Sequence, residues 1–453
     1  ELLRRAVWFL AIAALSGMMP SGAEALTWDI TTVDGPGDVG AYASIALDSG
    51  ENPGISYCAS GSDDLKYAYR TGGVWVVETV DATGRTGWYT SLAFDAADLP
   101  CIAYWDLSNS ALRFARWNGS VWNKETVDNS AYVGQCASLA LDSAGLPSIS
   151  YYDYTNGDLR YARFDGSVWH IEVLDDGAPL MGAGLYTSLA LDSQDRPHIS
   201  YADHTTGRLR YAGWDGAAWT LETVDGGTPI GTSIRLDSNG VPHISYAYQY
   251  GQGSHLKYAA RTGDGGTWQV RVARFGGQVG LYSSLRLRSD AEPCILSWDL
   301  GNSIVDYDCF VDGAWSHDTV ETMGFTDQWC ALALNGAGEP LAAYRSSGEA
   351  DLHFALGAGT SSVAGEPARV PVDPLRIFPN PVASGGRIQL SLPEGASVVR
   401  WFDAQGREAA PPAVFEAGPK REANWDAGRL GPGVYFAVSR GRSGEHVGRV
   451  VVR

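Results

Sequence analysis

The sequence contains few methionines, few cysteines and no cluster of basic residues. Of 453 residues, 4 are methionine and 6 are cysteine, and Lys plus Arg number 33 against 52 Asp plus Glu. A nucleic-acid-binding protein usually presents a basic stripe, whereas the formal net charge here is -19. The composition therefore argues against a nucleic-acid partner, and charge repulsion argues against anionic membranes and polymers.

Motifs for metal binding and for known catalytic machinery are also missing. The cysteines form no CxxC pair and no Cys/His cluster with zinc spacing; they are Cys58, Cys101, Cys136, Cys294, Cys309 and Cys330. No nucleophile elbow, metalloprotease helix, P-loop, EF-hand or sialidase box occurs. We therefore expect no metal and no cofactor, and no motif identifies a catalytic residue. The spacing leaves the disulfide pairing open.

A long apolar run occurs only at the start of the chain. Arg4 and Arg5 precede an unbroken apolar stretch from Ala6 to Leu15, and a small-x-small site follows at residues 23–25. This layout is typical of a secretory signal peptide, and the run is shorter than the roughly 20 residues of a membrane span. We expect residues 1–25 to be removed on export, with no membrane-spanning segment in the remainder.

One sequence unit recurs along most of the chain. A well-preserved copy runs from Leu139 to Asp153 as LALDSAGLPSISYYD and continues through LRYAR to Trp169. Its proline recurs at Pro53, Pro100, Pro147, Pro197, Pro242, Pro293 and Pro340. Its tryptophan recurs at Trp28, Trp75, Trp122, Trp169, Trp219, Trp268 and Trp315. Both series give seven copies spaced 45 to 51 residues apart, a period typical of a four-stranded β-propeller blade.

Each unit reads as four short strands separated by turn signals. The SLAL run alternates, proline opens the second strand, LRYAR is the third, and tryptophan begins the fourth. Residues 28–34 form a fourth strand without its first three, whereas the seventh unit, 331–356, has three strands and lacks the fourth. We therefore predict an all-β fold in which a seven-bladed propeller occupies residues 26–356 and the first segment completes the last blade, removing open edges.

The repeat resembles that of bacterial propeller proteins, and this resemblance carries no activity. A linker is expected over residues 357–372, and the composition changes beyond it. From Glu366 to Arg453 there are 12 basic and 9 acidic residues, a net of +3, and the signal segment nets zero, which leaves -22 for the propeller and linker. Short alternating strands in the last 80 or so residues predict a β-sandwich over 373–453.

The tail also carries specific motifs. These are IFPNP from Ile377, DAQGR from Asp403, LGPGVYF from Leu430 and a terminal strand from Val447 to Arg453. In combination they resemble the C-terminal sorting domain of type IX secretion cargo and are similar to the immunoglobulin-like domain of the flagellar hook-capping protein. The resemblance implies export through the outer-membrane secretion machinery to the surface of a Gram-negative bacterium. It leaves open whether the tail is cleaved.

The repeat register places candidate ligand-binding residues on one rim of the propeller. In this fold the loops entering first strands and those leaving second strands share the tunnel mouth. Two residues before the Ser or Ala of each first strand stand Tyr42, Tyr89, Cys136, Tyr186, Gly231, Tyr282 and Trp329, with Trp88 beside Tyr89. Asp106, Asp153, Asp203 and Asp299 follow four of the second strands. Aromatic faces and hydrogen-bonding carboxylates suit sugars.

The same residues also fit structural roles, because positions repeated in most blades commonly pack or cap turns. We expect purely structural roles for the fourth-strand tryptophans, which should pack between blades, and for His198 and His243 on the opposite face. Aspartates that end first strands should cap turns: Asp48, Asp95, Asp142, Asp192 and Asp237. The rim tyrosines and aspartates remain open to both readings.

Three functions follow from this arrangement. The leading hypothesis is a secreted or cell-surface protein whose rim binds an extracellular ligand such as carbohydrate. The alternatives are a polysaccharide hydrolase or lyase acting at the rim, and a scaffold that binds another surface protein. The repeat is more regular than expected for an enzyme, since active sites usually break symmetry. The sequence names no ligand and no oligomeric state.

Overall fold

The computed structural model describes two compact units that divide after Ser361. Described residues of the first unit are 26–177, 182–251, 253–263, 266–288, 291–322, 329–346 and 350–359. Those of the second are 376–378, 387–391, 398–403, 408–414, 422–426, 430, 433–441 and 444–452. The expected signal peptide and most of the expected linker lie outside the described residues. No helix in the described parts of the chain is long and apolar enough to cross a bilayer.

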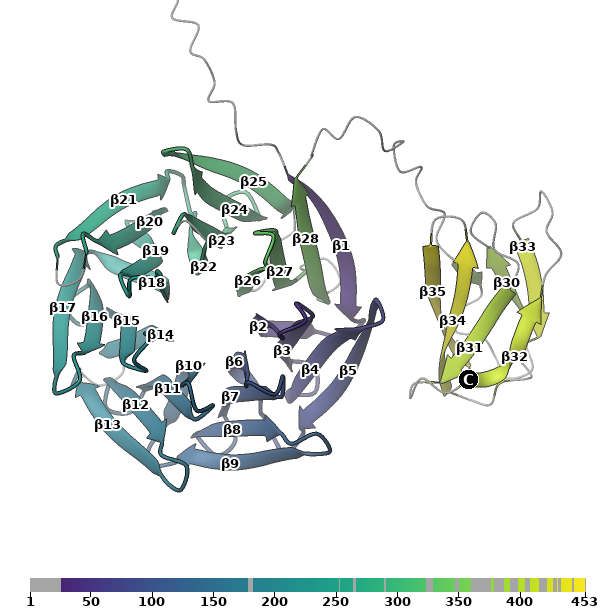
Figure 1. Ribbon diagram of the computed structural model, residues 1–453, viewed down its shortest axis with the longest axis horizontal. Helices are drawn as coiled ribbons and strands as arrows, with labels where there is room; N and C mark the ends of the chain where they lie inside the picture. Colours follow the sequence, from purple (N-terminus) through teal and green to yellow (C-terminus); the bar gives the residue numbers. More distant parts are fainter. Residues whose placement is uncertain are drawn as a thin grey trace, which may run out of the picture. The chain divides into compact units, whose positions relative to one another are not determined.

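The first unit is a seven-bladed β-propeller, as predicted, with each first strand innermost and each fourth strand outermost (Figure 1). Blade 1 consists of β2 (Val39–Leu47), β3 (Pro53–Ala59), β4 (Asp64–Thr71) and β5 (Val74–Asp81). Blade 2 consists of β6 (Trp88–Phe94), β7 (Pro100–Asp106), β8 (Ala111–Trp117) and β9 (Trp122–Asp128). Blade 3 consists of β10 (Val133–Leu141), β11 (Pro147–Asp153), β12 (Asp158–Phe164) and β13 (Trp169–Asp175). Blade 4 consists of β14 (Ala183–Leu191), β15 (Pro197–Asp203), β16 (Arg208–Trp214) and β17 (Trp219–Gly226).

Blade 5 consists of β18 (Thr228–Leu236), β19 (Pro242–Tyr250), β20 (Gly253–Arg261) and β21 (Trp268–Arg274). Blade 6 consists of β22 (Leu281–Leu287), β23 (Pro293–Asp299), β24 (Ile304–Val311) and β25 (Ala314–Thr322). A disulfide joins Cys294 to Cys309, which face each other across β23 and β24. Cys58, Cys101, Cys136 and Cys330 are buried free thiols.

Blade 7 closes the ring in the predicted way. It combines β26 (Cys330–Leu334), β27 (Pro340–Arg345) and β28 (Leu352–Gly359) with β1 (Leu26–Asp34) as its outer strand. β1 pairs antiparallel with β28, and Trp28 lies opposite Gly357. β28 thus extends three residues beyond residue 356, because its last residues pair with the start of β1. The closure satisfies an edge that would otherwise be unpaired.

The repeated tryptophans pack between neighbouring blades, as predicted. Each meets a third-strand tyrosine or phenylalanine of the preceding blade edge to face, which is a preferred geometry for aromatic pairs. Trp28 lies 5.6 Å from Tyr307, and Trp75 lies 5.1 Å from Phe354, between ring centroids. The same contact recurs for Trp122, Trp169, Trp219, Trp268 and Trp315. The second strands are almost fully buried between these layers.

The first-strand turns are capped as expected. The Asp48 carboxylate accepts hydrogen bonds from the amides of Gly50 and Asn52, and Asp95, Asp142, Asp192 and Asp237 do the same in their blades. On the same face, His198 and His243 hydrogen-bond to Tyr211 and Tyr258, which fits their predicted structural role.

The second unit contains only strands among its described residues. One sheet has the order β29-β30-β33, built from β29 (Arg376–Phe378), β30 (Arg387–Ser391) and β33 (Glu422–Asp426). The other has the order β32-β31-β34-β35, built from β31 (Val398–Asp403), β32 (Glu408–Val414), β34 (Gly433–Gly441) and β35 (Gly444–Val452). Two antiparallel sheets agree with the all-β expectation, and the immunoglobulin-like assignment stays a prediction.

Candidate functional site

The rim tyrosines stand on β-bulges at the start of the first strands. Pairing of β2 with β3, for example, shifts register between Ala41 and Ser44. At the bulge Tyr42, Tyr89, Cys136, Tyr186 and Tyr282 adopt left-handed backbone angles, with φ between 51° and 55°. Bulges of this kind re-aim a side chain away from the sheet. Here they turn the side chains towards the central axis of the propeller, where they line one cavity.

The predicted aromatic residues gather into one cluster at the tunnel mouth. Trp329 lies 4.6 Å from Tyr282, 5.2 Å from Tyr42 and 5.4 Å from Tyr89, between ring centroids. The Tyr186 ring meets the Tyr282 ring edge to face, at 5.8 Å between centroids, and the Trp88 ring lies 5.2 Å from the Tyr42 ring in a tilted arrangement. These rings, Trp88 excepted, line a cavity of about 160 Å³ together with the hydroxyl groups of first-strand serines and threonines.

The residues that carry these rings are partly buried. Burial raises the pKa of Tyr42, Tyr89 and Tyr186 well above the ordinary value, and nearby tyrosines and Cys136 add to the shift. Burial raises the pKa of the Cys136 thiol to about 12. The phenols are therefore neutral at physiological pH. They can donate and accept hydrogen bonds, and their ring faces supply apolar surface.

A ring of serines that the sequence analysis did not single out supports this cluster. Each Ser two residues after a bulge accepts a hydrogen bond from the first-strand amide of the next blade. The donors and acceptors are Leu92 to Ser44, Leu139 to Ser91, Leu189 to Ser138, Ile234 to Ser188, Leu285 to Ser233 and Leu332 to Ser284. The serine recurs in the repeat, but only the closed ring shows which amide it meets.

The four predicted rim aspartates are buried in turns rather than displayed in the cavity. Asp153 accepts hydrogen bonds from the amides of Thr155 and Asn156 and forms a 2.6 Å ion pair with Arg160. Asp106, Asp203 and Asp299 cap the corresponding turns of their blades. Their exposed fractions lie between 0% and 5%. Because these oxygens already have protein partners, the aromatic cluster is the part of the predicted site that offers free chemistry.

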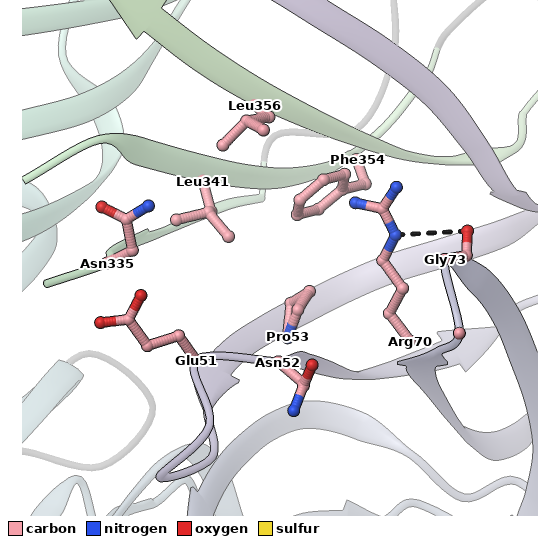
Figure 2. Close-up of a pocket in the computed structure, with 10 residues that line it drawn as sticks. Glu51, Asn52, Pro53, Arg70, Gly73, Asn335, Leu341, Phe354 and Leu356 are labelled. Carbon is pink, nitrogen blue, oxygen red and sulfur yellow. Dashed lines mark hydrogen bonds between the residues drawn. The ribbon is translucent and has the colours of Figure 1, made fainter. Parts of the chain in front are cut away.

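Clefts between blades form a second type of cavity, on the face that carries the first-strand turns. The cleft between blades 7 and 1, of about 290 Å³, is drawn in Figure 2. The Arg70 guanidinium lies 5.8 Å from the Phe354 ring centroid, and its Nε donates a 3.5 Å hydrogen bond to the Gly73 carbonyl. Leu341 and Pro53 complete the apolar wall.

These clefts repeat as a consequence of blade packing. Clefts of about 280, 250 and 230 Å³ occur between blades 1 and 2, 2 and 3, and 5 and 6. Each combines the repeated proline of one blade with the third-strand aromatic of the preceding blade. Those aromatics are the rings covered by the inter-blade tryptophans, and Phe354 is only 2% exposed.

The axial cavity contains no carboxylic acid among its described lining residues. A paired-carboxylate mechanism for glycoside hydrolysis consequently has no candidate pair within the described part of the cavity wall. Across the described ranges of both units, no group of three or more His, Cys, Asp or Glu is placed to hold a metal ion.

Comparison with known proteins shows the fold. No protein-family model and no curated protein matches the chain. An ulvan lyase, solved with GlcA(1-4)Rha3S bound, is 14% identical over 74% of this chain and 94% of its own, with a TM-score of 0.50. An α-L-arabinanase from Penicillium chrysogenum is 12% identical over 60% of this chain and 93% of its own, with a TM-score of 0.43. A Hadza microbial sialidase is 11% identical over 66% of this chain and 73% of its own, with a TM-score of 0.43.

Proposed function

We propose that the protein is an exported binding protein whose tunnel mouth binds carbohydrate. The observation that carries the proposal is the aromatic cluster of four tyrosines and Trp329, with the tyrosines held on left-handed bulges around one cavity. Backbone strain of this kind concentrates at functional sites. Aromatic rings and hydroxyl groups that line one cavity match the apolar faces and hydroxyl edges of a sugar ring. Structural neighbours that act on carbohydrates are consistent with this choice of ligand.

Binding is favoured over hydrolysis by the chemistry of the cavity wall. Glycoside hydrolysis commonly needs two carboxyl groups flanking the bond. The rim aspartates instead cap turns, and Asp153 forms an ion pair with Arg160. A glycoside hydrolase of this type at the mouth would need its two carboxyl groups from outside the described lining residues.

The test removes aromatic rings that line the cavity. Tyr186→Ala and Trp329→Ala each remove one platform, and we expect glycan affinity to fall about threefold to tenfold with thermal unfolding nearly unchanged. Tyr69→Ala, which alters the cleft between blades 1 and 2, is the matched control and should bind normally. Binding is measured on a glycan array and then by titration calorimetry on the same samples.

Three outcomes would contradict the proposal. If the rings only pack, the Ala variants should lose about 3–5 kcal/mol of stability, as buried aromatics do. If the parent protein binds no glycan, the scaffold hypothesis takes its place. Loss of binding in Tyr69→Ala alone would move the site to the clefts.

We further propose that the tail directs export to the cell surface through the type IX machinery. The support is the combination of tail motifs from Ile377 to Arg453 and the signal-like segment at residues 1–25. In a host with that machinery, removal of residues 362–453 should leave the propeller in the periplasm, as measured by cell fractionation. Surface display that persists without the tail would rule out this role.

A further inference from the structure

Two arginines break the sevenfold repeat inside the axial tunnel. The position concerned lies two residues after the hydrogen-bonding serine of each first strand, or after Ala331 in blade 7. Five blades carry alanine there: Ala46, Ala93, Ala140, Ala190 and Ala333. The adjacent blades 5 and 6 instead carry Arg235 on β18 and Arg286 on β22. An alanine suffices to pack this position in the other blades, so packing does not call for the two guanidinium groups.

Both guanidinium groups line the axial cavity below the aromatic mouth. Arg235 donates one hydrogen bond of 2.6 Å to the Ile234 carbonyl, and Arg286 donates one of 2.8 Å to the Leu285 carbonyl. A guanidinium carries five N–H donors, so most of its donor capacity is left over. Other tunnel-side groups among the described lining residues are hydroxyls and phenols rather than carboxylates.

The pair differs electrostatically from the arginines at the junctions between blades. Arg113 and Arg160, for example, each form ion pairs with buried aspartates. Within the described ranges no ion pair involves Arg235 or Arg286. Burial lowers the pKa of Arg235 to about 10, and burial together with the charge of Arg235 lowers that of Arg286. Two like charges held together in a partly desolvated site need a counter-charge.

We propose that Arg235 and Arg286 form an anion-binding site in the axial tunnel, which takes a small oxyanion or carboxylate group. Guanidinium groups bind such groups through paired, charge-assisted hydrogen bonds. The cavity, at about 160 Å³, holds the volume of roughly five waters, which is room for a sulfate-sized group. The anion comes either from solution or from the acidic substituent of a saccharide at the mouth. The site does not depend on carbohydrate binding.

The test titrates sodium sulfate into the full chain at constant ionic strength, balanced with sodium chloride. We expect saturable heat in calorimetry and a saturable rise in melting temperature. Arg235→Ala combined with Arg286→Ala should weaken sulfate binding by at least about tenfold. The variant should fold, because alanine is the residue at this position in five blades. In sulfate-free buffer it should be at least as stable as the parent, since two like charges are removed.

Arg208→Ala removes an exposed charge elsewhere on the propeller and should leave sulfate binding unchanged. A second arm compares a glucuronate-containing oligosaccharide with a neutral one of equal length. An arginine-dependent preference for the acidic sugar assigns the anion to a saccharide, whereas arginine-dependent binding of sulfate alone assigns it to a free ion. The site is ruled out if the double variant responds like the parent, or if neither probe binds the parent saturably. Neutral glycan binding without any anion effect would leave the proposed function intact and remove this site.

Discussion

At the scale of single residues, the tunnel mouth has tyrosines at positions whose left-handed backbone conformation favours glycine. A left-handed backbone costs a non-glycine residue about 1–2 kcal/mol. Tyr42, Tyr89, Tyr186 and Tyr282 carry that cost, and Gly231 occupies the same position in blade 5 without it. At Gly231 a side chain would not fit, since a Cβ would lie 2.4 Å from the Tyr282 Cα. The tyrosines are therefore present for their rings rather than for their backbone.

Two substitutions at one of these positions separate ring from backbone. Tyr186→Ala and Tyr186→Gly remove the same ring, but glycine also relieves the left-handed strain. We expect the glycine variant to be more stable than the alanine variant by about 1 kcal/mol in denaturant unfolding. The same pair at Tyr69, on the regular strand β4, should show the opposite order. An alanine variant of Tyr186 as stable as the glycine variant would contradict the strain argument.

At the scale of the blade, a polar junction recurs between neighbours. The fourth strand of one blade ends in a carboxylate that meets a second-strand tyrosine and a third-strand base of the next. The triads are Asp34-Tyr57-Lys66, Asp81-Tyr104-Arg113, Asp128-Tyr151-Arg160, Asp175-Tyr201-Arg210, Asp225-Tyr246-Lys257 and Glu321-Tyr344-His353. Each triad ties adjacent blades together through partly or fully buried polar groups that satisfy one another.

The junction between blades 5 and 6 reverses the charges. Arg274 ends the fourth strand, Asp306 replaces the base, and Ser297 replaces the tyrosine, so an ion pair survives with its polarity inverted. Burial raises the pKa of Asp306 to about 6, against the opposing effect of Arg274. Blades 5 and 6 thus depart from the repeat at this junction as well as at the tunnel arginines.

The regular junction makes stability depend on pH through Asp81. Burial alone would raise its pKa, but hydrogen bonds from Thr83, Tyr104 and Lys124, together with Arg113, hold the pKa of Asp81 below its ordinary value. A carboxylate with a lowered folded-state pKa stabilises the fold above its unfolded pKa of about 3.9, and this contribution is lost as pH falls through the folded value.

Asp81→Asn should therefore cost about 3–5 kcal/mol at pH 7, because it leaves Lys124 without its charge partner and leaves Arg113 with only the longer ion pair to Asp106. The gap between variant and parent should begin to narrow below about pH 4, where Asp81 of the unfolded chain becomes protonated, and should close as pH falls through the lower folded-state pKa of Asp81. Asp29→Asn, at an exposed position of β1, is the control and should show little effect at either pH. Unfolding is followed by urea titration at pH 7 and pH 3. A gap that stays constant with pH would contradict the ionic role.

At the scale of the whole molecule, closure joins the two ends of the propeller. β1 contributes the outer strand of blade 7, places Trp28 against Tyr307 of blade 6, and supplies Asp34 to the junction with blade 1. One nine-residue strand therefore contacts three blades, and the ring depends on it.

Deletion of residues 26–34 should lower stability by more than the 3–5 kcal/mol or so of a buried aromatic alone, because it also exposes the edge of β28. Melting temperature by circular dichroism measures the loss. A synthetic peptide of residues 26–34 added in trans should recover part of it. An unchanged melting temperature after the deletion would contradict the closing role.

The sequence by itself determined the number of blades, the strand order and the closure. These follow from local periodicity: the proline opens each second strand, the tryptophan begins each fourth strand, and Trp28 lacks three preceding strands. The sequence also predicted that the tryptophans pack between blades and that Asp48 and its counterparts cap turns. Both roles depend on neighbours that lie a fixed distance away in the repeat.

Only the tertiary structure decided what the rim residues touch. The rings of Tyr42 and Trp329 are 287 positions apart in the chain and meet because the ring closes. The sequence left Asp153 open to a ligand-binding or a turn-capping role, and the structure places turn amides and Arg160 around its carboxylate. In the sequence, nothing distinguishes Arg235 and Arg286 from other arginines as a pair. They line one cavity because the seven first strands surround a single axis. Periodicity specifies each blade, whereas contacts across the axis depend on the closed circle.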